Sequence, residues 1–225
     1  MTNTLHRFGA PESHRDDFVV FAMAAKEVND ADAVPKFQQF LRLALPHRPI
    51  NMAHAQNRGI YRAAEQLTPL VHWTRGDERL DPERIIREVE SCSTVAVVFD
   101  TREATIAFLA DLREADLGLS INVSALVEEG HACCKAAGLT RHSVEYSLGI
   151  HGDQSRLPDR HTLELSTMCG HGMVSHNFAR KMIDLVRENR RTPEQAAASM
   201  ARFCACGVFN PTRARRILEQ ARKGE

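Results

Sequence analysis

The middle of the chain carries a strand–helix–strand pattern, which constrains the fold more than any other feature of the sequence. Thr94–Phe99 is an apolar run rich in β-branched residues, and it predicts a buried strand. Thr101–Glu114 has helical periodicity, and Leu119–Ser124 alternates apolar and polar residues as a strand does. Strands that alternate with helices build a sheet with helices packed on it, of α/β or ferredoxin-like α+β type.

The N-terminal part of the chain reads as mainly helical. Apolar residues recur at helical spacing within Ser13–Asn29 and again within Phe37–Ala44. A third helical stretch runs from about Met52 to Gln66 and leads to Leu70–Trp73, which has the composition of a short strand. Asp81 precedes a proline and is placed to cap a further helix.

The C-terminal part of the chain adds strands and then only helices. A helix over 125–137 precedes Val144–Ile150, and the alternating pattern of that segment predicts a strand. Thr162–Ser166 alternates in the same way and predicts another strand. Three helices are then expected, over Val174–Glu188, from Thr192 to Phe203, and from Asn210 to about Lys223.

These patterns predict an α+β or α/β fold with a mixed sheet of about four to five strands and packed helices. We expect one domain over residues 1–225, because neither a repeat nor a linker-like tract divides the chain. Within it, 1–90 would be a helical segment, 91–168 the strand–helix core, and 169–225 a helical hairpin that carries a cysteine site.

Composition narrows the class of protein. Lys plus Arg and Asp plus Glu both number 29 among 225 residues, so no overall field attracts nucleic acid or an anionic membrane. Neither a secretory signal nor a long apolar run occurs, and we expect a cytoplasmic protein. In a reducing compartment the six cysteines are expected as thiols, metal ligands or catalytic groups. The Walker, Rossmann, nucleophile-elbow and zincin motifs are all missing.

Three of the cysteines lie in glycine-containing loops at the ends of expected helices. Cys169 and His171 are two residues apart in one loop, and Cys204 and Cys206 are two apart in the other. The two helices between the loops can form an antiparallel hairpin that returns the chain to its starting end. We therefore expect Cys169, Cys204 and Cys206 to bind a metal or cluster, with His171 as a fourth ligand or as an acid or base.

Two kinds of centre suit these ligands. A four-iron, four-sulfur cluster on three cysteines leaves one iron open to substrate, and this ligand count is similar to that of hydro-lyases and desulfurases. A zinc ion closed by His171 would be structural instead. The loop joins an expected strand to an expected helix, a common position for ligand sites, and this favours the cluster slightly.

The functional hypothesis is a cytoplasmic metalloenzyme of lyase type. It would remove water, sulfide or ammonia from a small polar substrate, with His171 and His176 as candidate catalytic groups beside the three cysteines. A homo-oligomer is compatible with the sequence, whereas membrane and nucleic-acid partners are not expected. The alternative is a zinc- or cluster-containing regulatory or binding protein that senses metal or redox state.

Overall fold

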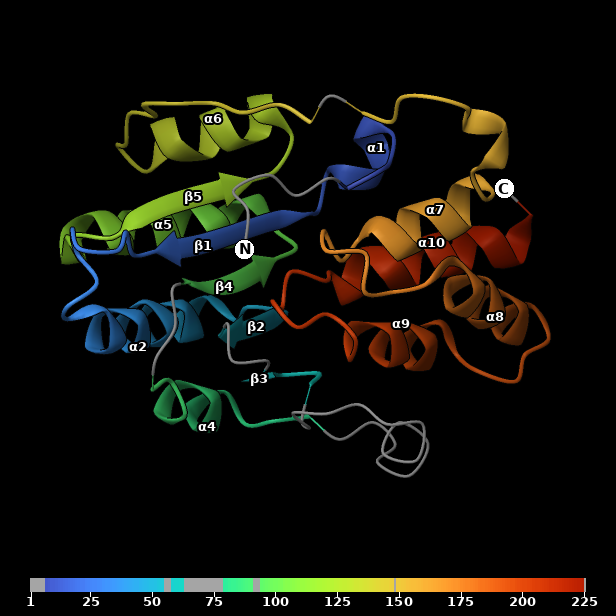
Figure 1. Cartoon of the computed structure of the whole chain (residues 1–225), viewed down its shortest axis with the longest axis horizontal. Coiled ribbons are helices and arrows are strands. Elements are labelled where there is room, and N and C mark those ends of the chain that lie inside the picture. Colours follow the sequence, from blue (N-terminus) through green and yellow to red (C-terminus); the bar gives the residue numbers. More distant parts are fainter. Residues whose placement is uncertain (1–6, 55–57, 63–78, 91–93, 148, 225) are drawn as a thin grey trace.

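A sheet of antiparallel strands forms the centre of the protein (Figure 1). The computed structural model describes residues 7–54, 58–62, 79–90, 94–147 and 149–224. Its described strands are β1 (Phe18–Met23), β2 (Asn51–His54), β3 (Arg58–Gly59), β4 (Thr94–Phe99) and β5 (Ser120–Ser124). They are ordered β3-β2-β4-β1-β5, and each pair is antiparallel. The expected α+β class is therefore confirmed, but the sheet is antiparallel and not mixed.

Helices follow most of the strands. The described α-helices are α1 (Pro11–His14), α2 (Ala33–Ala44), α4 (Pro82–Arg87), α5 (Arg102–Ala115), α6 (Val127–Ala136), α7 (Arg160–Thr167), α8 (His176–Arg187), α9 (Pro193–Ala201) and α10 (Pro211–Lys223). Two short 3₁₀ turns, Leu45–His47 and Gln154–Arg156, complete the list. None of the helices in these ranges is both long and apolar enough to cross a membrane.

The order of the strands defines the topology. Two strand–helix–strand units, β1-α2-β2 and β4-α5-β5, are interleaved so that β4 lies between β1 and β2 while β1 lies between β4 and β5. This is the split βαβ arrangement of ferredoxin-like α+β folds. The sequence pattern through the middle of the chain predicted one of these two units directly, since β4, α5 and β5 match the expected ranges.

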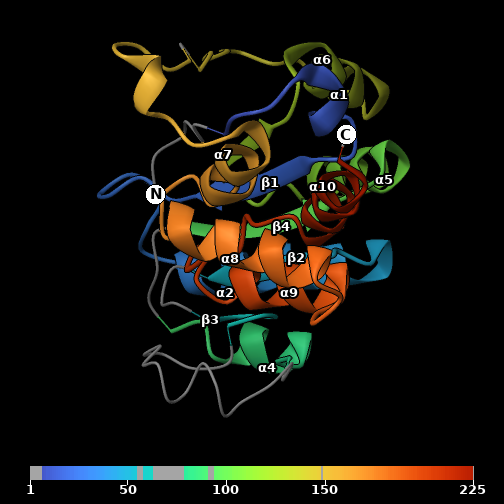
Figure 2. The same cartoon turned by 90° about the vertical axis from the view of Figure 1, so that its right-hand side faces the viewer.

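The sheet is covered on both faces. Successive side chains of a strand point to opposite faces, so Val19 and Phe21 of β1 face one hydrophobic cluster while Phe18 and Val20 face another. The first cluster is completed by α7–α10, and the second by α2, α4, α5 and α6. Figure 2 looks onto the C-terminal helices, which stand in front of the sheet in that view.

Burial of both faces of a strand explains two wrong predictions in the first 90 residues. The helix expected over Ser13–Asn29 contains strand β1, and the helix expected from Met52 overlaps strand β2. Phe18–Ala22 is buried throughout, so apolar residues occupy both faces of the strand and the two-residue alternation disappears. The described residues among the first 90 are therefore not mainly helical. The strand expected over Leu70–Trp73 lies outside the described residues.

Two later strand predictions are also wrong. Apart from Leu148, which is not described, Val144–Ile150 is an exposed segment without regular structure. Thr162–Ser166 lies inside helix α7, because the Asp159 side chain accepts a hydrogen bond from the Thr162 N–H at 3.0 Å and caps the helix. All five residues of this segment are buried, so their alternation of polar and apolar types does not reflect one exposed and one buried face of a strand.

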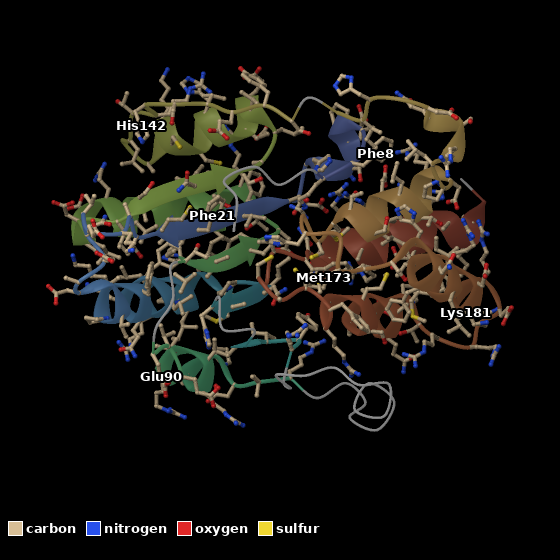
Figure 3. The ribbon with its side chains drawn as sticks, in the orientation of Figure 1. Phe8, Phe21, Glu90, His142, Met173 and Lys181 are labelled. Carbon is tan, nitrogen blue, oxygen red and sulfur yellow. The ribbon has the colours of Figure 1, made fainter. Side chains whose placement is uncertain are left out.

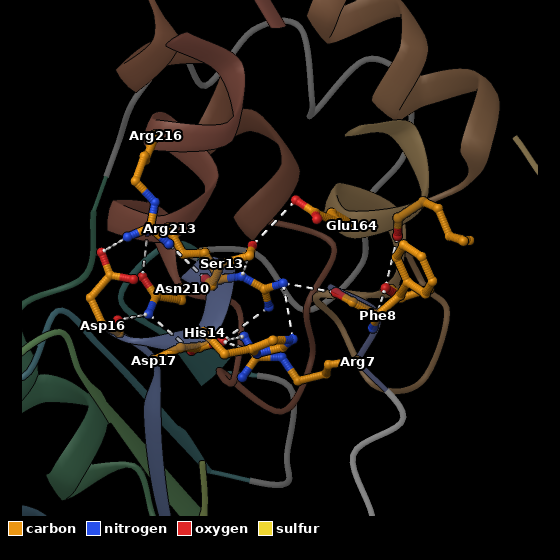
Figure 4. Close-up of polar contacts among 12 residues, drawn as sticks. Arg7, Phe8, Ser13, His14, Asp16, Asp17, Glu164, Asn210, Arg213 and Arg216 are labelled. Atoms are coloured by element: carbon orange, nitrogen blue, oxygen red, sulfur yellow. Dashed lines mark hydrogen bonds and ion pairs between the residues drawn. The ribbon is translucent and has the colours of Figure 1, made fainter. Parts of the chain in front are cut away.

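A buried ionic cluster joins the N-terminal segment to helix α10 (Figure 4). The Asp17 carboxylate lies 2.8 Å from Arg7, 3.0 Å from Arg213 and 3.5 Å from His14. Its other oxygen accepts a hydrogen bond of 2.9 Å from the Asn210 amide. Burial alone would raise the pKa of Asp17, but these four partners together hold it well below its usual value.

The same cluster extends to helix α7. The Arg213 guanidinium, which is fully buried, donates to Ser13 Oγ at 3.2 Å and to the Phe8 carbonyl at 2.8 Å. Ser13 in turn donates to the buried Glu164 carboxylate of α7 at 3.2 Å. Asn210 also caps α10 by accepting from the Arg213 N–H at 2.8 Å. The N-terminal segment is thus fixed to helices α7 and α10.

Candidate metal centre

Two turns with the same local geometry carry the cysteine and histidine residues. In the first, the Gly172 N–H donates to the Cys169 carbonyl at 2.9 Å, and in the second the Gly207 N–H donates to the Cys204 carbonyl at 3.3 Å. Gly172 and Gly207 have φ angles of 66° and 67°, a left-handed conformation that favours glycine. Each turn therefore has a cysteine first, a second ligand third and a glycine fourth.

The helical hairpin predicted between the two turns is confirmed. The first turn follows the end of α7, and α8 and α9 then pack against each other and against α10 before the chain reaches the second turn. Ser175 caps α8 by accepting from the Phe178 N–H, and Thr192 caps α9 in a reciprocal pair with Gln195. These caps fix where helices α8 and α9 begin.

Donor atoms from the two turns lie close together. Cys206 Sγ is 3.3 Å from His171 Nδ1 and 3.7 Å from Cys204 Sγ. The ligand atoms of Cys169, His171 and Cys206 all lie within 4.8 Å of one another, so these three residues could hold a metal ion. Cys204 adjoins this group through Cys206. The three sulfurs are buried, whereas the imidazole of His171 is exposed.

Hydrogen bonds among the three thiols set which of them ionises first. Hydrogen bonds from Cys204 and Cys206 lower the pKa of Cys169 far below the usual thiol value, and backbone N–H groups of Met173 and His171 add to this. The same contact with Cys169 raises the pKa of Cys204 and of Cys206. One thiolate is therefore favoured among the three sulfurs, and a cation is needed before all three can ionise.

An arginine from the sheet reaches the segment that leads into the second cysteine turn. Arg62 follows strand β3, is partly buried, and donates from Nη1 to the Arg202 carbonyl at 3.3 Å. Burial lowers the pKa of this guanidinium, and the negative charges of Cys204 and Cys169 oppose that effect. Sequence reasoning missed Arg62, because it lies far from both cysteine turns in the chain and carries no local signal.

The other residues considered from the sequence lie elsewhere. His176 is the first residue of α8, is exposed, and does not belong to the group that could hold an ion. Cys133 is buried in α6 and Cys134 is half-buried beside it, while Cys92 lies outside the described residues. Met173, exposed at 51%, follows the first turn where the sheet and the C-terminal helices meet (Figure 3).

The second turn packs tightly on the sheet. A Cβ atom added at Gly207 would collide with the Ala53 side chain and would lie 2.9 Å from the Ala53 nitrogen and 3.1 Å from the Met52 carbonyl carbon, both in β2. At Gly172 an added Cβ would meet nothing within 4 Å. The two glycines share the same φ but differ in their surroundings, so they form a matched pair.

We expect Gly207→Ala to destabilise the protein more than Gly172→Ala. Both substitutions place alanine in the left-handed region at a cost of about 1–2 kcal/mol. Only Gly207→Ala adds overpacking against β2, which costs about 1–3 kcal/mol more. Urea unfolding followed by circular dichroism measures the difference, and equal losses for the two variants would contradict the packing of this turn on the sheet.

The fold and the site together define an antiparallel α+β protein with a group of buried cysteines and an exposed histidine that could hold a metal ion. Comparisons with protein families, with curated proteins and with solved structures found no significant match for this chain.

Proposed function

We propose that this chain is a zinc-binding protein whose single ion is held by Cys169, His171, Cys204 and Cys206. The observation that best supports this proposal is the spacing of the donor atoms. A tetrahedral ion with zinc–sulfur bonds of about 2.3 Å places neighbouring sulfurs about 3.8 Å apart, and a sulfur and a nitrogen about 3.5 Å apart. The distances of 3.7 Å from Cys206 to Cys204 and 3.3 Å from Cys206 to His171 are close to these values.

The spacing supports one ion in preference to a cluster. In a four-iron cluster each cysteine binds a different iron atom, so the cysteine sulfurs lie farther apart than two ligands of one ion. Bringing Cys204 and Cys206 onto two irons would require the second turn to open. That turn is closed by the hydrogen bond from Gly207 to Cys204 and packs on β2 through Gly207.

A closed zinc site would have a structural role. Its ligands come from the end of α7 and from the connection between α9 and α10, so one ion would fasten the helical hairpin of α8 and α9 at its open end. Structural zinc sites of this ligand type contribute directly to folding free energy. The proposed function is therefore that of a zinc-stabilised binding or regulatory protein.

The lyase-type enzyme with an open iron–sulfur cluster is the second candidate. It is favoured by the exposure of His171, which would leave one side of a centre on the three buried cysteines accessible to a small polar substrate. In that protein His171 would act as an acid or base beside the bound substrate. No role for His176 follows from its position at the start of α8.

Metal analysis of protein purified without oxygen separates these candidates. We expect one zinc per chain, no iron or acid-labile sulfide, and no visible absorption. Replacement of zinc by cobalt should give the intense visible bands of a tetrahedral site and a sulfur-to-cobalt charge-transfer band in the near ultraviolet. Brown protein that contains iron and sulfide in equal amounts would support the enzyme instead, and protein that binds neither metal would overturn both candidates.

A further inference from the structure

A zinc ion with three thiolates and a neutral imidazole carries a net charge of −1, and this charge must be placed in a largely buried site. The three sulfurs come from residues that are at most 6% exposed. Water can therefore solvate little of the charge, and burying an uncompensated charge is costly. A protein that holds such a centre needs a cation or several N–H donors close to the sulfurs.

Arg62 is placed to supply that cation. Its guanidinium donates to the carbonyl of Arg202, the residue that ends α9 two positions before Cys204. Burial lowers the pKa of this guanidinium, and the negative charges of Cys204 and Cys169 act against that effect. Arginine is suited to this place because its guanidinium remains charged when partly buried and can donate to several acceptors at once.

The backbone of Arg62 is joined through β3 to β2, the strand on which the second cysteine turn packs. Arg62 exchanges backbone hydrogen bonds with Gly59, at 3.0 and 3.4 Å, and Gly59 pairs with Ala53 of β2. Ala53 is also the residue against which Gly207 packs. The segment from Arg202 to Gly207 is thus held to this edge of the sheet at both of its ends.

We propose that Arg62 is the positioning residue of the metal centre: it balances the negative charge of the three-thiolate site and holds the end of α9 that presents Cys204. This inference rests on the proposed zinc site. It links the sheet to an ion whose ligands all belong to the C-terminal part of the chain. Arg62 itself does not bind the ion.

The test compares zinc affinity in wild-type protein, R62Q, R62K and the control R79A. Arg79 is a neighbouring arginine whose guanidinium lies 4.9 Å from the ring centre of Tyr61, so its removal leaves the charge of Arg62 in place. Competition with a chromophoric zinc chelator measures each affinity. We expect R62Q to bind zinc about 10–100-fold more weakly than wild type, R62K to recover most of the loss, and R79A to match wild type.

Cobalt spectra separate the electrostatic role from a merely structural one. A cation beside the sulfurs stabilises their electrons and raises the energy of the sulfur-to-cobalt band. We therefore expect this band to move to longer wavelength in R62Q and to stay in place in R79A. A structural defect alone would weaken binding without an ordered shift across R62Q, R62K and wild type.

Each outcome decides the proposal. Wild-type protein that binds no zinc overturns the proposed function, and with it this inference. Wild-type binding with R62Q within about twofold of it and with an unshifted cobalt band overturns the inference alone. If R62Q does not fold, R62K decides: zinc affinity within about tenfold of wild type supports the role of the charge, and a loss above about 100-fold overturns it.

Discussion

Cys206→Ser is expected to abolish zinc retention and to lower the melting temperature by roughly 10 °C. Cys206 is the residue whose sulfur contacts both Cys204 and His171, so its loss removes the centre of the donor group. Losing a partner that merely orients a ligand weakens metal binding about 10–100-fold, and losing a ligand itself weakens it further. Zinc at about 1,000 times its dissociation constant stabilises a protein by about 4 kcal/mol, and each kcal/mol corresponds to about 2–4 °C in a chain of this size.

Cys134→Ser provides the control, since Cys134 is a half-buried thiol on α6 outside the metal-binding group. Zinc content and thermal unfolding are measured for both variants, with and without a strong chelator. Chelation should lower the melting temperature of wild type and of Cys134→Ser, and it should leave Cys206→Ser unchanged. Equal zinc content in the two variants would show that the ion, if present, is held elsewhere.

The sequence predicted the elements of the fold that show a clear period and missed those buried on both sides. Helix α5 has one apolar face and polar residues opposite, so its bounds were predicted almost completely. Strand β1 alternates between two apolar clusters, and that alternation is invisible when both faces bear Phe and Val. Helix α7 was missed because its alternating residues conceal the cap at Asp159, which the sequence also contains.

The candidate site was predicted more completely than the sheet that supports it. Its candidate ligands lie in two short segments, each with a cysteine, then any residue, then cysteine or histidine, and then glycine. Helical periodicity between these segments predicted the hairpin that joins the two turns. Arg62 and the packing of Gly207 on Ala53 are long-range features. They depend on strand β2, which was predicted as helix, and so no local pattern could reveal them.

Asp17→Asn is expected to destabilise the protein by about 3–5 kcal/mol, because it leaves the buried guanidinium of Arg213 without its carboxylate. Neither side chain of this pair is exposed, so water cannot replace the lost partner. Asp16→Asn is the matched control, since Asp16 pairs with Arg216 and both of these side chains are about a fifth exposed to water. That variant should lose less than Asp17→Asn, because water reaches both partners of its ion pair. Urea unfolding at pH 7 measures both, and equal losses would contradict a central role for Asp17.

Lowering the pH should remove the difference in unfolding free energy between wild type and Asp17→Asn. Burial opposes ionisation of Asp17, but Arg7, His14, Arg213 and Asn210 hold its pKa in the folded state well below the value of about 3.9 in an unfolded chain. The carboxylate therefore stabilises the fold fully above that unfolded value, and its contribution is lost as the pH falls toward the folded pKa. Below about pH 4 the unfolding free energy attributable to this group should fall by up to about 1.4 kcal/mol per pH unit in wild type, and Asp17→Asn should lack this component. Parallel pH profiles of the two proteins would show that the carboxylate is not stabilised by its cationic partners.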